Sequence, residues 1–225
     1  MNSNSTIAIL GDIHGCYNTL LKVFGQLSGI KEIYTVGDLI DRGKYSKEVV
    51  EFCMKNNIKP VKGNHEDMMI RAIDNSDKFF GFLFKDAELY YQNGGGETQY
   101  SYIRSRLFSN FTKFKQELKA LGHYDYIKNF PLRYEFKKVI ISHAGIIEGG
   151  NDISVLWNRS TPARLDKLQI FGHTPLKDFA YKRDYYSNID TGCVYKNKLT
   201  AIIVDTDEGN IKEIIQEDCH PMDVE

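Results

Sequence analysis

Five short apolar runs in this chain each end abruptly in a polar residue that can bind a metal ion. The segments read IAIL-GDIH, IYTV-GDLID, PVK-GNHE, VIIS-HAG and LQIF-GHTP. In four of them a glycine directly precedes the polar residue, so the chain can bend sharply there and approach a ligand. Four of the six histidines fall at these ends. Independent loop residues would not cluster in this way, and the pattern therefore predicts one site at the ends of strands.

Strands and helices alternate early in the sequence, and strands dominate late. A β-rich run at Thr6–Leu10 is followed by apolar residues at helical spacing from Tyr17 to Leu27, and Ser46 is placed to cap a second helix. The middle, from His65 to Gly122, is mostly helical in pattern. Further strands are expected at 33–36, 132–136, 139–142, 168–171, 186–189 and 199–204. This order favours an α/β (α+β) fold, with mixed sheets covered by helices.

Length and charge limit the possibilities further. No repeat or linker divides the 225 residues, so we expect one domain over 1–225, with 216–225 as a flexible, acidic tail. The 29 basic and 30 acidic residues leave a net charge of −1, which excludes nucleic-acid binding driven by bulk charge. Signal-peptide and membrane-span patterns are missing, and the four cysteines are far apart in sequence. We therefore expect a cytoplasmic protein with reduced thiols, without a disulfide framework or a zinc site.

The polar residues at the strand ends offer carboxylate, imidazole and amide ligands, and no thiolate is part of the pattern. This donor set suits Mn, Fe, Zn or Mg and is poor for copper or an iron–sulfur cluster. There are enough ligands for two ions if one carboxylate is shared. Two ions about 3.5–4 Å apart can clamp a phosphoryl group and activate a water. The residues concerned are Asp12, His14, Asp38, Asp41, Asn64, His65, His143 and His173.

The motifs GDIHG, GDLIDRG and GNHE, followed by HAG and GHTP, resemble those of the phosphoprotein phosphatase (PPP) family of metallophosphoesterases. The segments NGGGET, LWNR and NIDTGCVY are similar to the small prokaryotic and phage lambda-type Ser/Thr protein phosphatases. The resemblance runs from about Ile7 to Asp205. It implies a sandwich of two mixed β-sheets flanked by helices.

The resemblance also implies residue roles. Asp12 and His14 would hold a first metal ion, Asp38 would bridge two ions, and the second would be held by Asn64, His143 and His173. His65 would be the general acid, paired with Asp41, and the substrate phosphate would be bound by Arg42 and Arg159. Two divalent ions are implied, with Mn favoured and Fe, Zn, Mg, Ni or Co also open.

One position departs from the family pattern. Lys62 stands where the small phosphatases often have arginine, so the charge is kept and the two-pronged hydrogen bonding is lost. Lys62 is either a weaker phosphate contact or a solvated lysine at a strand end. The sequence leaves both open.

The leading hypothesis is a metal-dependent phosphoprotein phosphatase for phosphoserine and phosphothreonine, with phosphotyrosine also open. The alternative within enzymes is a symmetrical bis(5'-nucleosyl)-tetraphosphatase, and a broader phosphodiesterase or nucleic-acid end-phosphatase activity is also compatible. A catalytically inactive binding module is disfavoured because no ligand of the pattern is missing. The expected partner is a phosphorylated protein, or a phosphorylated small-molecule or nucleotide substrate. The oligomeric state is left open, and a monomer is compatible.

The aromatic insert over 68–122 has two interpretations. Its rings, among them Phe79, Phe80 and Phe82, form a helical core, or its exposed part walls the substrate groove. In the second case the glycines at 94–96 would form a mobile loop over the site.

Overall fold

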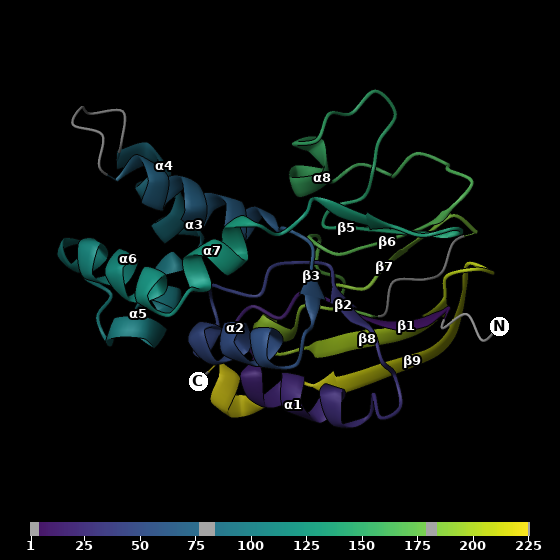
Figure 1. Cartoon of the computed structure of the whole chain (residues 1–225), viewed down its shortest axis with the longest axis horizontal. Helices are drawn as coiled ribbons and strands as arrows, with labels where there is room; N and C mark the ends of the chain where they lie inside the picture. Colours follow the sequence, from purple (N-terminus) through teal and green to yellow (C-terminus); the bar gives the residue numbers. More distant parts are fainter. Residues whose placement is uncertain (1–4, 77–83, 179–183, 225) are drawn as a thin grey trace.

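Two mixed β-sheets face each other in the computed structural model of the chain (Figure 1), which describes residues 5–76, 84–178 and 184–224. Helices lie beneath one sheet and in a separate group beside the sandwich. The expected fold class is thereby confirmed. None of the helices in the described residues is both long and apolar enough to cross a membrane.

The first sheet has the strand order β3-β2-β1-β8-β9. Its strands are β3 (Lys59–Pro60), β2 (Ile33–Thr35), β1 (Thr6–Leu10), β8 (Lys198–Asp205) and β9 (Asn210–Asp218). The first three run parallel, so their carboxyl ends meet at one edge, while β8 and β9 are antiparallel to their neighbours. The second sheet has the order β4-β5-β6-β7, in which only β4 runs antiparallel to its neighbour. Its strands are β4 (Arg133–Glu135), β5 (Val139–Ser142), β6 (Leu168–Phe171) and β7 (Tyr186–Asn188).

The buried strand β1 serves two cores because its side chains alternate between its two faces. Ile7 and Ile9 join the cluster between the sheets, which includes Ile141 and Ile170 of the opposite sheet. Ala8 and Leu10 point the other way, into the cluster shared with the helices. A strand buried on both faces reads as a continuous apolar run, which is why TIAIL carries no polar alternation.

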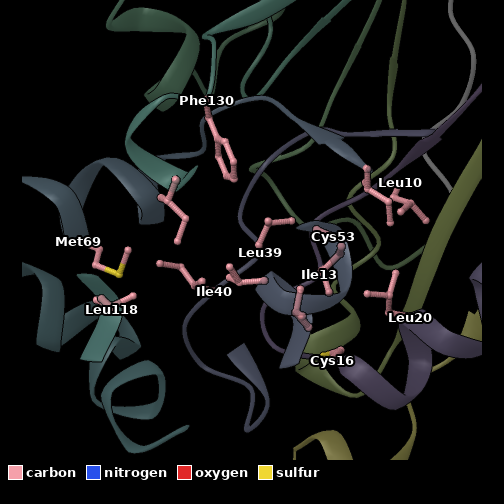
Figure 2. Close-up of a cluster of buried hydrophobic side chains, with 14 of the residues drawn as sticks. Leu10, Ile13, Cys16, Leu20, Leu39, Ile40, Cys53, Met69, Leu118 and Phe130 are labelled. Carbon is pink, nitrogen blue, oxygen red and sulfur yellow. The ribbon is translucent and has the colours of Figure 1, made fainter. Parts of the chain in front are cut away.

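The helices fall into two groups. The helices α1 (Tyr17–Gly25) and α2 (Ser46–Lys55) lie beneath the first sheet, and the others follow later in the chain. They are α3 (Asn64–Asn75), α4 (Phe84–Tyr90), a π-helical turn (Tyr91–Gly95), α5 (Gly96–Ile103), a 3-10 turn (Phe108–Asn110), α6 (Phe111–Ala120), α7 (His123–Lys128) and the short α8 (Ser154–Trp157). Figure 2 shows that one apolar cluster runs from Leu20 of α1 to Met69 of α3 and Leu118 of α6.

The structure differs from the sequence expectation at the chain's C-terminal segment. Residues 216–218 complete β9, and a 3-10 turn follows at Pro221–Asp223. The carboxylate of Asp223 is fully buried and accepts hydrogen bonds from the backbone N–H groups of Asn18 and Thr19, both at 2.9 Å. Residues 216–224 of the segment expected to be a flexible tail are thus packed against the fold, because the Asp223 carboxylate satisfies unpaired N–H groups at the start of α1.

The triple glycine also differs from expectation. Gly94 lies in the π-helical turn with a φ of 103°, and Gly96 opens α5. The carbonyl of Gly94 accepts a hydrogen bond from the Arg42 N–H (3.3 Å), and a Cβ on Gly94 would press against Arg42. The segment is therefore a kinked helix junction packed against residue 42 and not a loop, and the mobility suggested for it stays a prediction. Of the expected aromatic insert, Phe79, Phe80 and Phe82 lie outside the described residues.

Candidate metal centre

The strand ends bring six of the predicted side chains into one buried cluster. Each follows its strand within a few residues, and all are nearly inaccessible to solvent. The set, called the strand-end cluster below, consists of Asp12, His14, Asp38, Asn64, His143 and His173. The side-chain atoms of Asp38 lie close to those of His14, and of His65 outside the set, on one side and to those of His143 and His173 on the other. The two groups share only Asp38.

Asp38 is the centre of this arrangement. Its Oδ2 lies 3.5 Å from His14 Nε2 and 3.4 Å from His143 Nε2. Its Oδ1 accepts a hydrogen bond from the backbone N–H of His65 (3.1 Å). Burial by itself would raise the pKa of Asp38, but the positive charge of protonated His65 and the hydrogen bond from its backbone N–H hold that pKa below its usual range. The group is therefore ionised, as a carboxylate.

Backbone carbonyls fix which ring nitrogen carries the proton in two of the histidines. His14 Nδ1 lies 2.7 Å from the Ile40 carbonyl, and His143 Nδ1 lies 2.8 Å from the Val36 carbonyl. Since a carbonyl only accepts, each Nδ1 donates. Burial lowers the pKa of both rings, so they stay neutral and each Nε2 carries a lone pair on the side of Asp38. This is the state in which histidine binds a metal ion.

The second side of the cluster contains acceptors that face one another. Asn64 Oδ1 lies 2.8 Å from His143 Nε2 and 2.9 Å from His173 Nδ1. His143 Nε2 already carries a lone pair, so it and the amide oxygen are both acceptors. His173 Nε2 is buried with no hydrogen-bond partner among the described residues. Converging lone pairs and an orphaned buried nitrogen fit a bound cation and would be unfavourable without one.

Glycines allow the backbone to approach the carboxylates. A Cβ on Gly172 would collide with the carboxylate of Asp12, and a Cβ on Gly63 would collide with that of Asp38. The backbone N–H of His173 can therefore donate to Asp12 Oδ2 (3.1 Å). The glycines of the GNHE and GHTP motifs are thus explained by close approach to the cluster.

Backbone strain is concentrated at the same place. Of the eight non-glycine residues with positive φ among the described residues, five belong to the predicted site. Their φ angles are 45° at His14, 50° at Asp38, 74° at Asp41, 68° at Arg42 and 71° at His173. Such conformations cost roughly 1–3 kcal/mol each and persist where the surrounding structure enforces them, which is typical of functional sites.

A histidine–carboxylate pair lies beside the cluster. His65 Nδ1 is 2.6 Å from Asp41 Oδ2, and the other carboxylate oxygen accepts from the Thr98 hydroxyl (2.6 Å). His65 Nε2 faces Asp38 at 3.9 Å. Burial by itself would lower the pKa of His65, but the Asp38 and Asp41 carboxylates outweigh it and raise that pKa. These contacts favour the protonated ring of His65, with Nε2 on the side of the cluster.

The predicted phosphate-binding residues are placed unequally. Arg42 Nη1 donates to His14 Nε2 (2.7 Å), and its guanidinium lies over the ring of Tyr195. Arg159 is exposed. Burial lowers the pKa of His173 to about 3, and the positive charge of Arg159 contributes to this lowering. Lys62, in contrast, donates from Nζ to the Lys128 carbonyl at the end of α7 (3.0 Å). The structure brings both arginines to the cluster and turns the lysine toward a helix end.

Two buried carboxylates near the cluster were missed by the sequence analysis. Asp190 follows β7, and burial with the charge of Asp38 raises its pKa to about 7. Glu66 accepts from the backbone N–H groups of Gly63, Asp38 and Leu39 at 2.8–3.0 Å, and so joins the loop after β2 to the start of α3. Burial raises the pKa of Glu66 to about 7. The signal for Asp190 was present, since the run YSNID is one more strand that ends in an acidic residue.

Comparison with known proteins agrees with this geometry. A sequence profile of calcineurin-like phosphoesterases matches residues 5–204. The chain belongs to this family. The phosphoesterase is 28% identical to Serine/threonine-protein phosphatase 2 of Salmonella typhimurium, over 86% of this chain and 90% of that protein. It is 30% identical to the asymmetrical bis(5'-nucleosyl)-tetraphosphatase PrpE of a Geobacillus species, over 87% of this chain and 89% of that protein. Relatives of both activities are thus similarly distant.

Solved structures with the same fold also include both kinds of enzyme. A candidate diadenosine tetraphosphatase superposes with a TM-score of 0.68 at 19% identity, over 98% of the phosphoesterase and 96% of that chain. A Saccharomyces cerevisiae protein serine/threonine phosphatase superposes with a TM-score of 0.59 at 17% identity, over 96% of the phosphoesterase and 80% of that chain. These likenesses confirm the fold, including the expected two-sheet sandwich.

Proposed function

We propose that this phosphoesterase hydrolyses phosphate monoesters of alcohols, with phosphoserine and phosphothreonine in proteins as its substrates. The strand-end cluster would hold two divalent ions, with Asp38 shared between them. Asp12 and His14 would complete one ligand set, and the other would comprise Asn64, His143 and His173. When bound, two such ions supply an activated water and neutralise charge on the phosphoryl group. Manganese is the ion we would test first, since the donors are oxygen and imidazole nitrogen.

The observation that carries this proposal is the buried Asp41–His65 pair. A serine or threonine alkoxide is a poor leaving group and needs a proton as the ester bond breaks. Asp41 holds Nδ1 of His65 at 2.6 Å, which leaves Nε2 as the nitrogen facing the cluster. The raised pKa of His65 favours the protonated ring before the reaction. A polyphosphate leaving group is already stable as an anion and gains less from such a donor.

The two arginines would bind the substrate phosphate. Arg159 is exposed and within electrostatic range of His173, and Arg42 lies beside His14. A guanidinium fork matches the spacing of phosphate oxygens and carries the opposite charge. Arg42 donates to a nitrogen that is also a candidate ligand atom, so we expect it to turn toward the phosphate when an ion is bound.

The test is a substrate panel with added Mn²⁺. Phosphoserine, phosphothreonine and phosphotyrosine peptides are compared with diadenosine tetraphosphate and an activated aryl phosphate. His65→Asn should slow phosphoserine hydrolysis about 10²–10⁴-fold while slowing the activated aryl phosphate far less. Equal losses on both would overturn the role of His65. Inert peptides beside a good tetraphosphate rate would overturn the substrate class.

Hydrolysis of dinucleoside tetraphosphates is the second candidate function, and one structural observation favours it. Beside Arg42 lies a pocket of about 410 Å³, with the exposed ring of Tyr195 and the side chains of Lys177 and Lys196 among its walls. An aromatic ring and lysines suit a base and a phosphate chain. The relatives with this activity are named as the asymmetrical type, whereas the sequence resemblance suggested the symmetrical one. Tyr195→Ala should lower the tetraphosphate rate and leave the peptide rate unchanged.

A further inference from the structure

Three of the four cysteines meet in the folded chain, although they are far apart in sequence. The sulfur atoms of Cys16, Cys193 and Cys219 all lie within 4.8 Å of one another. All three are free thiols, as expected, and the first two are buried. Cys16 is labelled in Figure 2 at the α1 end of the apolar cluster. The sequence analysis did not foresee this convergence, because each cysteine comes from a different segment.

Backbone hydrogen bonds hold each cysteine in place, and the thiols of Cys16 and Cys219 also donate to the carbonyls of His14 (3.8 Å) and His220 (3.6 Å). The N–H of Cys16 donates to the Ile13 carbonyl (3.0 Å), and the N–H of Cys219 donates to the Asn197 carbonyl (2.7 Å). The carbonyl of Cys193 accepts from the Lys196 N–H (3.0 Å) in a 3-10 turn. The three thiols are therefore brought together by the fold itself, and a ligand would find them already assembled.

The neighbouring polar groups are occupied elsewhere. The Thr19 hydroxyl donates to Asp223 Oδ2 (2.6 Å) and accepts from the His220 N–H (2.9 Å). The Asp223 carboxylate takes four hydrogen bonds from Asn18 and Thr19. The grouped donors here are thus sulfur atoms alone, in contrast to the oxygen and nitrogen atoms of the strand-end cluster.

We propose that Cys16, Cys193 and Cys219 form a binding site for a thiophilic metal ion of low coordination number, separate from the strand-end cluster. Thiolates select soft ions and disfavour Mn²⁺ and Mg²⁺. Sulfurs bound at about 2.3 Å to one ion lie about 4 Å apart, so only a small contraction is needed. Each thiol releases its proton to solvent as its sulfur–metal bond forms. A disulfide would use two of the sulfurs and leave the third without a role.

The site would join distant parts of the chain. Cys16 lies two residues after His14, Cys193 lies three residues after Asp190, and Cys219 directly follows β9. An ion held by all three would cross-link the loops after β1 and β7 to the C-terminal segment. We therefore expect binding to raise the thermal unfolding temperature.

The experiment is a titration of the full chain with Cd²⁺ in reducing buffer that contains excess Mn²⁺. An ultraviolet thiolate-to-metal absorption band reports sulfur ligands alone, so any Cd²⁺ in the strand-end cluster is silent. Cys219→Ala removes the least buried of the three sulfurs, and Cys53→Ala, in α2, is the matched control. We expect Cys219→Ala to weaken the band and lower the affinity at least about tenfold, since even outer-shell changes cost 10–100-fold. Cys53→Ala should leave both unchanged.

Three results would overturn the proposal. They are a wild-type chain without the band, equal titrations of wild type and Cys219→Ala, and a band that grows without saturating at one thiolate-bound ion per chain. A second measurement uses wild type alone, in case the variant fails to fold. Bound Cd²⁺ should slow the alkylation of Cys219, the least buried thiol, as located by mass, and should raise the unfolding temperature. Equal alkylation of Cys219 with and without Cd²⁺ would refute the site.

Discussion

The strand-end cluster and the helical region over α4–α7, residues 84–128, are built on opposite principles. The cluster packs carboxylates, imidazoles and an amide into an almost solvent-free space, on strained backbone. The helical region buries rings and aliphatic side chains such as Phe114 and Leu118, and its described charged pairs, such as Arg106 with Glu97, lie at the surface. The strained backbone and buried polar groups of the cluster lower the stability of the fold, whereas the apolar burial of the helical region raises it.

The two regions meet at few points. The Thr98 hydroxyl of α5 donates to Asp41, and the Gly94 carbonyl accepts from the Arg42 N–H. Through these contacts the helical region holds the residues that flank the cluster, while the ligands themselves depend on the sheets. Substitutions should therefore separate into those that change the rate and those that change stability.

The largest effect is expected at Asp38. Asp38→Asn removes the charge shared by both ligand groups, and loss of several kcal/mol of charge stabilisation lowers the rate at least about 10³-fold, at about 1.4 kcal/mol per tenfold. Phosphopeptide hydrolysis with Mn²⁺ measures it, and circular dichroism checks the fold. Asp86→Asn, at an exposed ion pair with Arg71, is the matched control and should keep the full rate. If Asp38→Asn kept more than about one tenth of the wild-type rate, Asp38 would not be the carboxylate shared by the two ions.

Leu118→Ala should show the reverse behaviour. Leu118 is fully buried in α6, so its truncation should cost about 3 kcal/mol of unfolding free energy through lost contacts and a cavity. The rate per folded molecule should stay within about twofold because no ligand moves. Urea unfolding compares it with Leu107→Ala, whose side chain is 66% exposed and whose loss should be small. A large loss of rate in Leu118→Ala, measured where the variant is fully folded, would show that the helical region also affects the rate.

A smaller effect concerns pH. Burial lowers the pKa of His123 to about 4, and its Nδ1 pairs with the Tyr102 hydroxyl (2.7 Å). The unfolded histidine titrates near about 6.5. Between these values the unfolded chain binds the extra proton, so this contribution to stability is full above pH 6.5 and is lost as the pH falls toward 4. Wild type should thus lose more stability than His123→Gln between pH 7 and 5 in urea unfolding. Parallel curves would contradict the assignment.

The smallest effect is expected at Arg106. Its Nε and Nη2 donate to both carboxylate oxygens of Glu97 at 2.6 and 2.7 Å, but the side chain is half exposed. Arg106→Ala should cost less than about 1 kcal/mol, and high salt should reduce the difference. A larger, salt-independent cost would show that the stacking of the guanidinium on the Tyr100 ring contributes more than the ion pair with Glu97.

The sequence predicted the strand-end cluster better than its surroundings, for physical reasons. Its residues follow apolar strands at glycine turns, so local pattern and parallel pairing together indicate where they meet. Strands β5 and β6 were predicted at their observed bounds. The partners of distant segments gave no local signal, as with the meeting of Asp223 and Thr19. The edge strand β9 was missed because its polar residues read as a surface segment, and Asp190 because the strand before it is only partly apolar.

The buried contact between Asp223 and Thr19 has a consequence for how the protein is made. The two residues are separated by 204 positions in the chain. At about 5–20 residues per second, a ribosome needs roughly 10–40 s to travel that distance. During this time β1 lacks its neighbour β8, and α1 lacks the carboxylate at its first turn. Asp12 and His14 are therefore synthesised early, but the loop that carries them reaches its final position late. The site is complete only when the last segment of the described chain has emerged.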